Sequence, residues 1–223
     1  QKITLQEGLV DVIMREYYGE QLNELHEKLI AMGKACEESI KKSYEALKKK
    51  DTGLAREIMD GSIEISHMER DIESKCMKLL LLQQPVAGDL RNVSAALKII
   101  TDLERIGINA GDIAEIIETV DFDFNENNIP LRDMAEETIQ MITDSMTAFV
   151  DEDIKLARNT IKRDDKVDSL FLKVREGLCS GKMMESQRLD QLMIAKYYER
   201  IGDHSVNIAR WVIYAVSGAH DEE

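Results

Sequence analysis

The feature that most constrains this chain is an internal repeat. The tetrapeptide Glu-Arg-Ile-Gly occurs twice, at residues 104–107 and at residues 199–202. Earlier in each half, a shift of 102 positions aligns Leu54-Ala55-Arg56 with Leu156-Ala157-Arg158. At the tetrapeptide itself, the shift between the two halves is 95 positions. Two matching stretches at matching places are hard to produce by chance. The repeat therefore predicts a duplicated unit and not one undivided domain.

Hydrophobic spacing predicts that each half is made of three helices. Apolar residues recur every three or four positions, which is the helical period. Prolines occur only at 85 and 130, and aromatic residues make up only 5% of the chain, which argues against a sheet. The sequence therefore predicts an all-α protein of two tandem three-helix bundles related by internal duplication. The expected helices span about 15–49, 52–84, 89–120, 131–150, 153–178 and 185–216.

The same pattern gives the expected domain boundaries. The first repeat covers residues 14–120 and the second covers residues 131–218. Between them, residues 121–130 form a polar linker with three asparagines. Met14 opens a regular helix pattern, so residues 1–13 are interpreted as an upstream extension or an expression remnant.

Charge and cysteine content restrict the possible partners and compartment. The net charge of −14 disfavours binding to nucleic-acid phosphates. The three cysteines form no CxxC pair, which indicates a reducing compartment. No apolar run approaches the roughly 20 residues of a membrane span. We therefore expect a cytoplasmic protein.

Acidic residues fall on helix faces that should be buried. In the last helix, Glu199 lies in the inward seam, and Asp203 and Asn207 flank it. In the fifth helix, Asp164 and Asp168 occupy core positions. A carboxylate inside a bundle is unfavourable unless it is paired or binds a metal. If these helices pack antiparallel, the sequence predicts an oxygen-rich cluster suited to Mg²⁺, Mn²⁺, Fe or Zn²⁺.

Simpler interpretations remain open at these positions. Most acidic pairs four residues apart lie on solvated surfaces. We expect His204 to lie on the surface or to face a partner. Arg105 and Arg200 are expected to balance charge or to lie on the surface, and Trp211 is expected in the core or at a dimer contact. Lysines and arginines do not converge at any expected helix start, so the sequence shows no phosphate pocket.

Three motifs in order give the chain a resemblance to a known family. They are Gln83-Gln84-Pro85-Val86-Ala87-Gly88-Asp89-Leu90-Arg91, Asp102-Leu103-Glu104-Arg105-Ile106-Gly107, and the run from Tyr198 to Ala209. The chain resembles the PhoU family, the accessory regulators of bacterial phosphate uptake, from Met14 to Gly218.

The resemblance implies two three-helix bundles, each with a multinuclear metal site formed by E(D)xxxD motifs. Iron or zinc is the metal it implies, with manganese or magnesium as further possibilities. It also implies a non-enzymatic negative regulator that links a phosphate ABC transporter ATPase to a sensor histidine kinase. Such a protein is expected to be a homodimer that lies against the membrane only through its partners.

The first half departs from the family pattern. Three of its matching positions carry no acid, namely Ser62, Ser66 and Ile108. Glu104 keeps its place, and Asp112 stands where the second half has Asn207. We therefore predict one competent metal site, made of Asp164, Asp168, Glu199, Asp203 and Asn207, and a degenerate site at Glu104 and Asp112.

Two other functions compete with this interpretation. One is a helical scaffold that binds no metal. The other is an enzyme of the carboxylate-bridged dimetal class, whose bundles use two Glu-x-x-His motifs. Only Glu64 and His67 have that spacing, and the repeat does not reproduce it.

Overall fold

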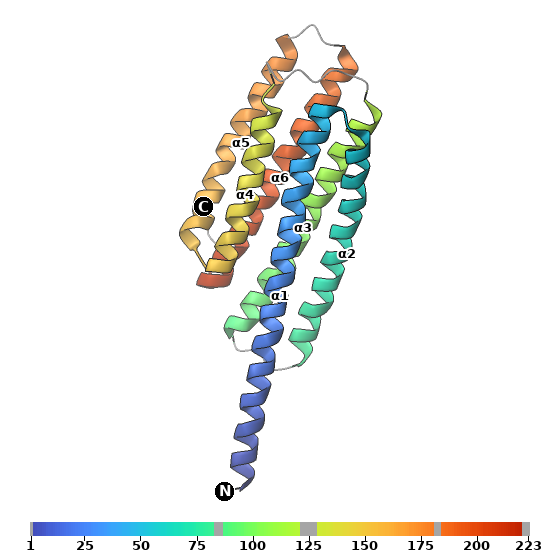
Figure 1. Cartoon of the computed structure of the whole chain (residues 1–223). Coiled ribbons are helices and arrows are strands. Elements are labelled where there is room, and N and C mark those ends of the chain that lie inside the picture. Colours follow the sequence, from blue (N-terminus) through green and yellow to red (C-terminus); the bar gives the residue numbers. More distant parts are fainter. Residues whose placement is uncertain (1, 83–86, 121–128, 181–183, 220–223) are drawn as a thin grey trace.

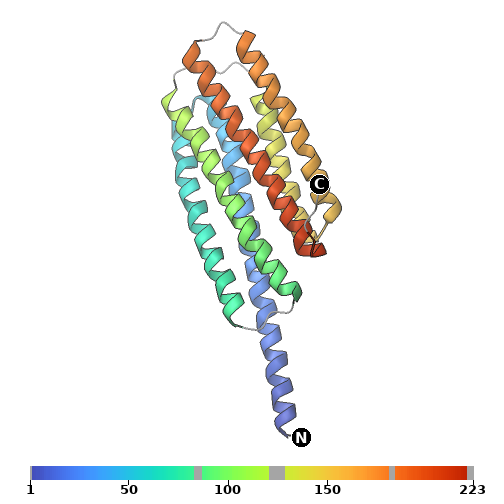
Figure 2. The same ribbon diagram turned by 180° about the vertical axis from the view of Figure 1, so that it is seen from behind.

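The computed structural model describes residues 2–82, 87–120, 129–180 and 184–219. Within these ranges it contains helices and no strand. Figures 1 and 2 show six long helices aligned along one axis. They are α1 (Lys2–Lys49), α2 (Thr52–Leu82), α3 (Ala87–Thr119), α4 (Leu131–Asp151), α5 (Ile154–Ser180) and α6 (Glu185–Ser217).

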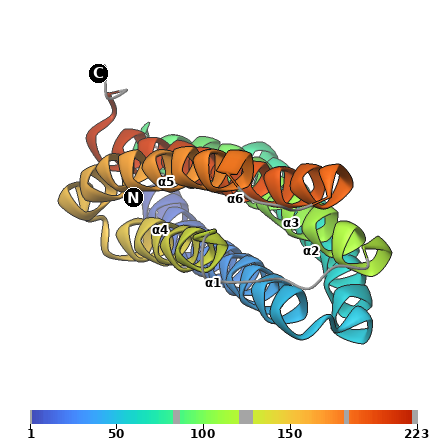
Figure 3. The same ribbon diagram turned by 90° about the horizontal axis from the view of Figure 1, so that it is seen from above.

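The helices form two three-helix bundles that pack side by side, as the repeat predicts. Helices α1, α2 and α3 contact one another, and so do α4, α5 and α6. Between the bundles, α3 packs on α6 and α1 packs on α4. Seen from above, α1 and α4 lie in one row, which faces a row containing α6 and α3 (Figure 3).

Helix boundaries agree with the sequence prediction to within a few residues, except at the start. Helix α1 begins at Lys2 and not near Arg15, and its first turns project beyond the bundle (Figure 1). No proline interrupts residues 2–15, and a single internal glycine at position 8 is tolerated in a helix. Most of the predicted linker, residues 121–128, lies outside the described residues.

The same turn joins the first two helices of each half. Lys50 and Glu152, which are 102 positions apart, both adopt positive φ, at 51° and 53°. The following aspartates, Asp51 and Asp153, donate their backbone N–H groups back into the preceding helix. Their carboxylates accept hydrogen bonds from the third residue on, at 2.9 and 3.0 Å, which caps the next helix. The duplication is therefore visible in backbone geometry as well as in sequence.

One hydrophobic core runs through both halves. Buried apolar residues from all six helices belong to a single cluster. Fully buried Tyr198 of α6 shares a 2.9 Å hydrogen bond with Ser43 of α1, which ties the second bundle to the first. Among the described residues, no helix is long and apolar enough to cross a bilayer.

Candidate functional site

Four carboxylates of α5 and α6 lie close enough to repel one another. Burial, followed by the charges of Asp168, Asp203 and Glu199, raises the pKa of Asp164 to about 6. Burial and the neighbouring Glu199 also raise the pKa of Asp203. The structure therefore brings together the four acids that the sequence placed in one cluster, called here the α5–α6 carboxylate cluster. Asp164 and Glu199 are partly buried, but Asp168 and Asp203 are exposed, so the expectation that Asp168 occupies a core position is wrong.

Asp164 contributes a buried oxygen to this cluster. Its Oδ1 atom is buried and has no hydrogen-bond partner. The atom rests against Gly202, where an added Cβ would lie only 2.9 Å from it. A buried carboxylate oxygen without a partner is unfavourable, because its lost hydration is not replaced. The glycine thus makes room for an oxygen that needs a cation or a proton.

Lys196 provides one positive charge at the edge of the cluster. Its ammonium group contacts both carboxylate oxygens of Glu199 at 2.5 Å and lies over the ring of Phe171. In the described part of the chain, no three histidine, cysteine or acidic side chains are arranged to hold a metal. The donor set and the unpartnered oxygen suit a hard cation, and Glu199 would have to leave Lys196 to join Asp164 in binding one.

The matching region of the first half has a different arrangement. Glu104 lies near Glu69 of α2, and burial together with Glu104 raises the pKa of Glu69. Ser62, the repeat match of Asp164, donates its hydroxyl to the carbonyl of Met59. This half therefore has a Glu69–Glu104 pair but no counterpart of the Asp164 carboxylate.

Helix packing around the two repeat glycines is conserved between the halves. A Cβ on Gly107 would lie 2.8 Å from Ile65, and one on Gly202 would lie 3.5 Å from Val167. Ile65 and Val167 are 102 positions apart, so the two pairs match in the repeat. In both halves the glycine lets a neighbouring helix pack closely, and Gly202 additionally faces the carboxylate of Asp164.

Two predicted ligands belong to the α3–α6 interface. Asn207 donates its amide to Asp102 of α3 at 3.2 Å. Asp112 hydrogen-bonds to Tyr197 of α6 and is close to Arg200. It lies eight positions along α3 from Glu104, or about 12 Å. The structure therefore does not bring Glu104 and Asp112 together as one site.

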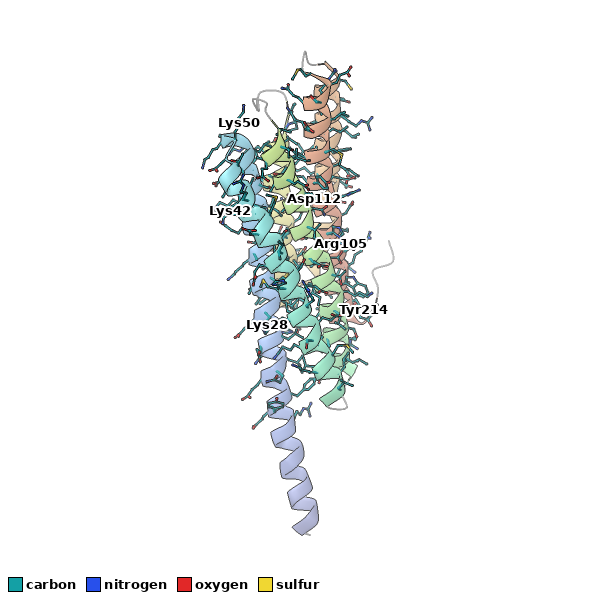
Figure 4. All side chains as sticks on the ribbon, turned by 90° about the vertical axis from the view of Figure 1, so that its right-hand side faces the viewer. Lys28, Lys42, Lys50, Arg105, Asp112 and Tyr214 are labelled. Carbon is teal, nitrogen blue, oxygen red and sulfur yellow. The ribbon has the colours of Figure 1, made fainter. Side chains whose placement is uncertain are left out.

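Of the residues that flank this interface, His204 differs from the sequence interpretation and Arg200 agrees with it. His204 was expected on a surface or facing a partner, but it is half-buried and its Nδ1 lies 2.9 Å from Asp102. Arg200 is exposed and stacks over Tyr197. Burial raises the pKa of Asp112, and the charge of Arg200 partly offsets that rise, which fits a charge balancer. Figure 4 shows Arg105 and Asp112 at different heights along α3.

Comparison with known proteins identifies the repeated unit. The family model for the PhoU domain matches twice, over residues 29–117 and 131–212. The chain belongs to the PhoU family. Both matched segments fall within the repeats expected at 14–120 and 131–218.

Curated PhoU relatives match this chain along almost its full length. A phosphate-specific transport system accessory protein PhoU homolog from Clostridium acetobutylicum is 36% identical and covers 92% of this chain and 96% of its own length. A homolog of the same description from Aquifex aeolicus is 35% identical, with 89% and 92% covered.

Solved PhoU structures share the fold. The crystal structure of PhoU from Pseudomonas aeruginosa superposes with a TM-score of 0.84 at 30% identity, covering 91% of this chain and all of that one. PhoU from Streptococcus pneumoniae, a phosphate transport system regulatory protein, gives 0.83 at 24% identity, covering 92% of this chain and all of that one. The two-bundle architecture is therefore that of the PhoU fold.

Sequence reasoning missed two features of this region. Glu69 was missed because its repeat match is Phe171, an apolar residue, so the duplication gave no reason to single it out. The contact between Asp102 and His204 was missed because it joins two halves whose relative packing no local pattern fixes.

Proposed function

We propose that this protein is an accessory regulator of a phosphate transport system. Two PhoU domains in one chain, with the length and fold of curated PhoU proteins, carry this proposal. We further propose that it is cytoplasmic and restrains phosphate uptake and the phosphate-starvation response. It would do so by contacting a phosphate ABC transporter ATPase and a sensor histidine kinase, and would reach the membrane only through them.

We propose that regulation, and not turnover, is its activity. The one Glu-x-x-His spacing, Glu64 and His67, lies on exposed surface, with side-chain exposures of 73% and 57%. A carboxylate-bridged dimetal enzyme would need such histidines to face the bundle interior. The Glu64 and His67 motif therefore does not support the enzyme alternative.

The α5–α6 carboxylate cluster is proposed as a metal site. Asp164, Asp168, Glu199 and Asp203 would hold the metal, and a bound cation would supply the positive charge that these acids lack. Zinc sites usually include cysteine or histidine, but the nearby His204 is engaged by Asp102. An all-oxygen donor set favours iron, manganese or magnesium over zinc.

Metal analysis separates this proposal from the metal-free scaffold alternative. Protein purified from metal-replete medium is measured by plasma mass spectrometry, together with Asp168→Ala/Asp203→Ala and the matched control Ser62→Ala/Ser66→Ala. We expect bound metal that is lost in the first variant and kept in the second. Equal metal content in all three proteins, or none in any, would contradict the metal site.

Complementation tests the regulatory role. A bacterial strain that lacks its PhoU protein and expresses phosphate-starvation genes constitutively receives this gene. We expect repression of those genes in high phosphate to return. Continued constitutive expression, with the protein present at normal abundance, would contradict the proposed regulation. Homodimerisation stays a prediction that sedimentation of the same preparation measures.

A further inference from the structure

A groove of about 500 Å³ lies between α1 and α4, away from the α5–α6 carboxylate cluster. It spans the last turns of α1 and the first turns of α4. Its volume lies within the range of small-ligand sites, which is about 300–1,000 Å³. Basic residues do not converge at any one helix start in the sequence, and those of the groove come together only because α1 and α4 meet in the folded molecule.

The groove is positively charged in a strongly negative protein. Four cationic side chains and two acidic ones line it, namely Lys41, Lys48, Lys49, Arg132, Glu45 and Glu136. The two acids are already engaged by groove cations. Glu45 lies 3.5 Å from Lys49, and Glu136 accepts a 2.8 Å hydrogen bond from Arg132. The local charge is therefore opposite to the −14 of the whole chain.

Apolar and aromatic side chains also line the groove. Tyr44 and Ile139 are partly buried against the hydrophobic core, and Ala135 is 1% exposed. A surface of this kind accepts a flat or apolar group, and the surrounding ammonium and guanidinium groups accept negative charge. The combination suits a ligand that carries both a ring and an anion.

The repeat supplies an internal control for this arrangement. The counterpart of Ala135 is Gly33, and the counterpart of Tyr44 is Met146. Met146 is buried and packs so closely on Gly33 that an added Cβ would lie 2.8 Å from its Cγ. The counterparts of the cations Lys41, Lys48 and Lys49 are uncharged or acidic, namely Thr143, Val150 and Asp151. The basic groove is thus not an automatic product of the duplicated fold.

We propose that this groove binds a nucleotide, with the base against Tyr44 and Ile139 and the phosphates among the lysines and Arg132. The groove cations act over roughly the Debye length, about 8–10 Å at physiological ionic strength. A compact polyphosphate stays within that distance. A long acidic peptide would extend over the acidic surface beyond it and be repelled, so the charge pattern favours the small ligand.

Calorimetric titration of the full-length protein with ATP in EDTA tests the proposal, because EDTA keeps the carboxylate cluster from recruiting metal–nucleotide complexes. The test variant is Lys41→Glu/Lys48→Glu, which reverses two exposed charges seven residues apart on α1. The matched control is Lys78→Glu/Lys173→Glu, which reverses two exposed charges on α2 and α5 outside the groove.

We expect saturable ATP binding tighter than about 1 mM. The groove variant should weaken it by about ten-fold or more, because it replaces two attractive charges by repulsive ones. The control should bind like the unchanged protein. Adenosine and pyrophosphate alone should each bind more weakly than ATP, since each uses only half of the groove.

Four outcomes would overturn the proposal. They are no ATP binding at about 1 mM, equal loss in the control variant, pyrophosphate binding as tight as that of ATP, and binding of a glutamate-rich peptide in place of ATP. Circular dichroism of both variants, whose changes are all at exposed positions, checks that each is folded.

Discussion

At the scale of single residues, the two repeat glycines have different neighbours. The Cβ of Gly107→Ala would press on Ile65, a buried β-branched side chain that cannot move aside. Overpacking of this kind costs about 1–3 kcal/mol, of which the helix preference of alanine offsets about 1 kcal/mol. We expect Gly107→Ala to destabilise the protein in urea unfolding.

Gly202→Ala should behave differently, because its new Cβ meets the movable carboxylate end of Asp164. Because the helix preference of alanine offsets the small cost of moving this carboxylate, we expect a change in the free energy of unfolding within about 1 kcal/mol, together with weaker metal binding. Equal destabilisation by both substitutions would show that Asp164 is held as rigidly as Ile65.

The charge state of Asp164 gives the metal-free protein an unusual pH dependence. The pKa of this carboxyl is raised from 3.8 to about 6 in the folded state. Between these values the folded protein holds a proton that the unfolded chain has released, so stability falls as pH rises through this window. Allowing for its partial exposure, the loss is about 1–2 kcal/mol.

We therefore expect Asp164→Asn to be more stable than the unchanged protein at pH 7.5 and similar to it at pH 4.5, measured by urea unfolding in chelator. The matched variant Asp165→Asn, on the exposed side of α5, should show no such difference. A stability gap that is constant with pH would contradict the raised pKa.

At the scale of elements, Asp51 and Asp153 play the same part in the two repeated turns, because each caps the helix that follows. Each carboxylate caps a helix start through one backbone N–H at 2.9 or 3.0 Å. Replacing either by alanine should lower the free energy of unfolding by about 1 kcal/mol. Asp60→Ala, on the exposed face of α2, is the control. Thermal unfolding of the three variants measures this, and a loss at only one cap would contradict the equivalence.

The elements also show what sequence reasoning can reach. The six helices follow from local hydrophobic spacing, and the caps at Asp51 and Asp153 follow from residue type. The Asp164 and Glu199 cluster could be predicted because both acids break an otherwise apolar seam. Glu69 and the basic groove could not, because Glu69 matches an apolar residue in the repeat and the groove joins helices whose contact is purely tertiary.

At the scale of the whole molecule, the two halves share one core. Tyr198 is fully buried against α1, and α3 packs along α6. We expect residues 131–219 alone to lack a cooperative thermal transition, because that fragment exposes the surface that α1 and α3 cover. Full-length protein should unfold in a single transition. A fragment that melts sharply near the temperature of the full chain would contradict a shared core.

The duplication is structurally symmetric in its turns and asymmetric in its acids. Its first half pairs Glu69 with Glu104, whereas the second gathers four carboxylates around an unpartnered Asp164 oxygen. Crystals of metal-loaded protein measured on both sides of the iron absorption edge test this asymmetry most directly. We predict anomalous density between α5 and α6 and none between α2 and α3. Density of equal height at both places, or at the Glu69–Glu104 pair alone, would contradict the account.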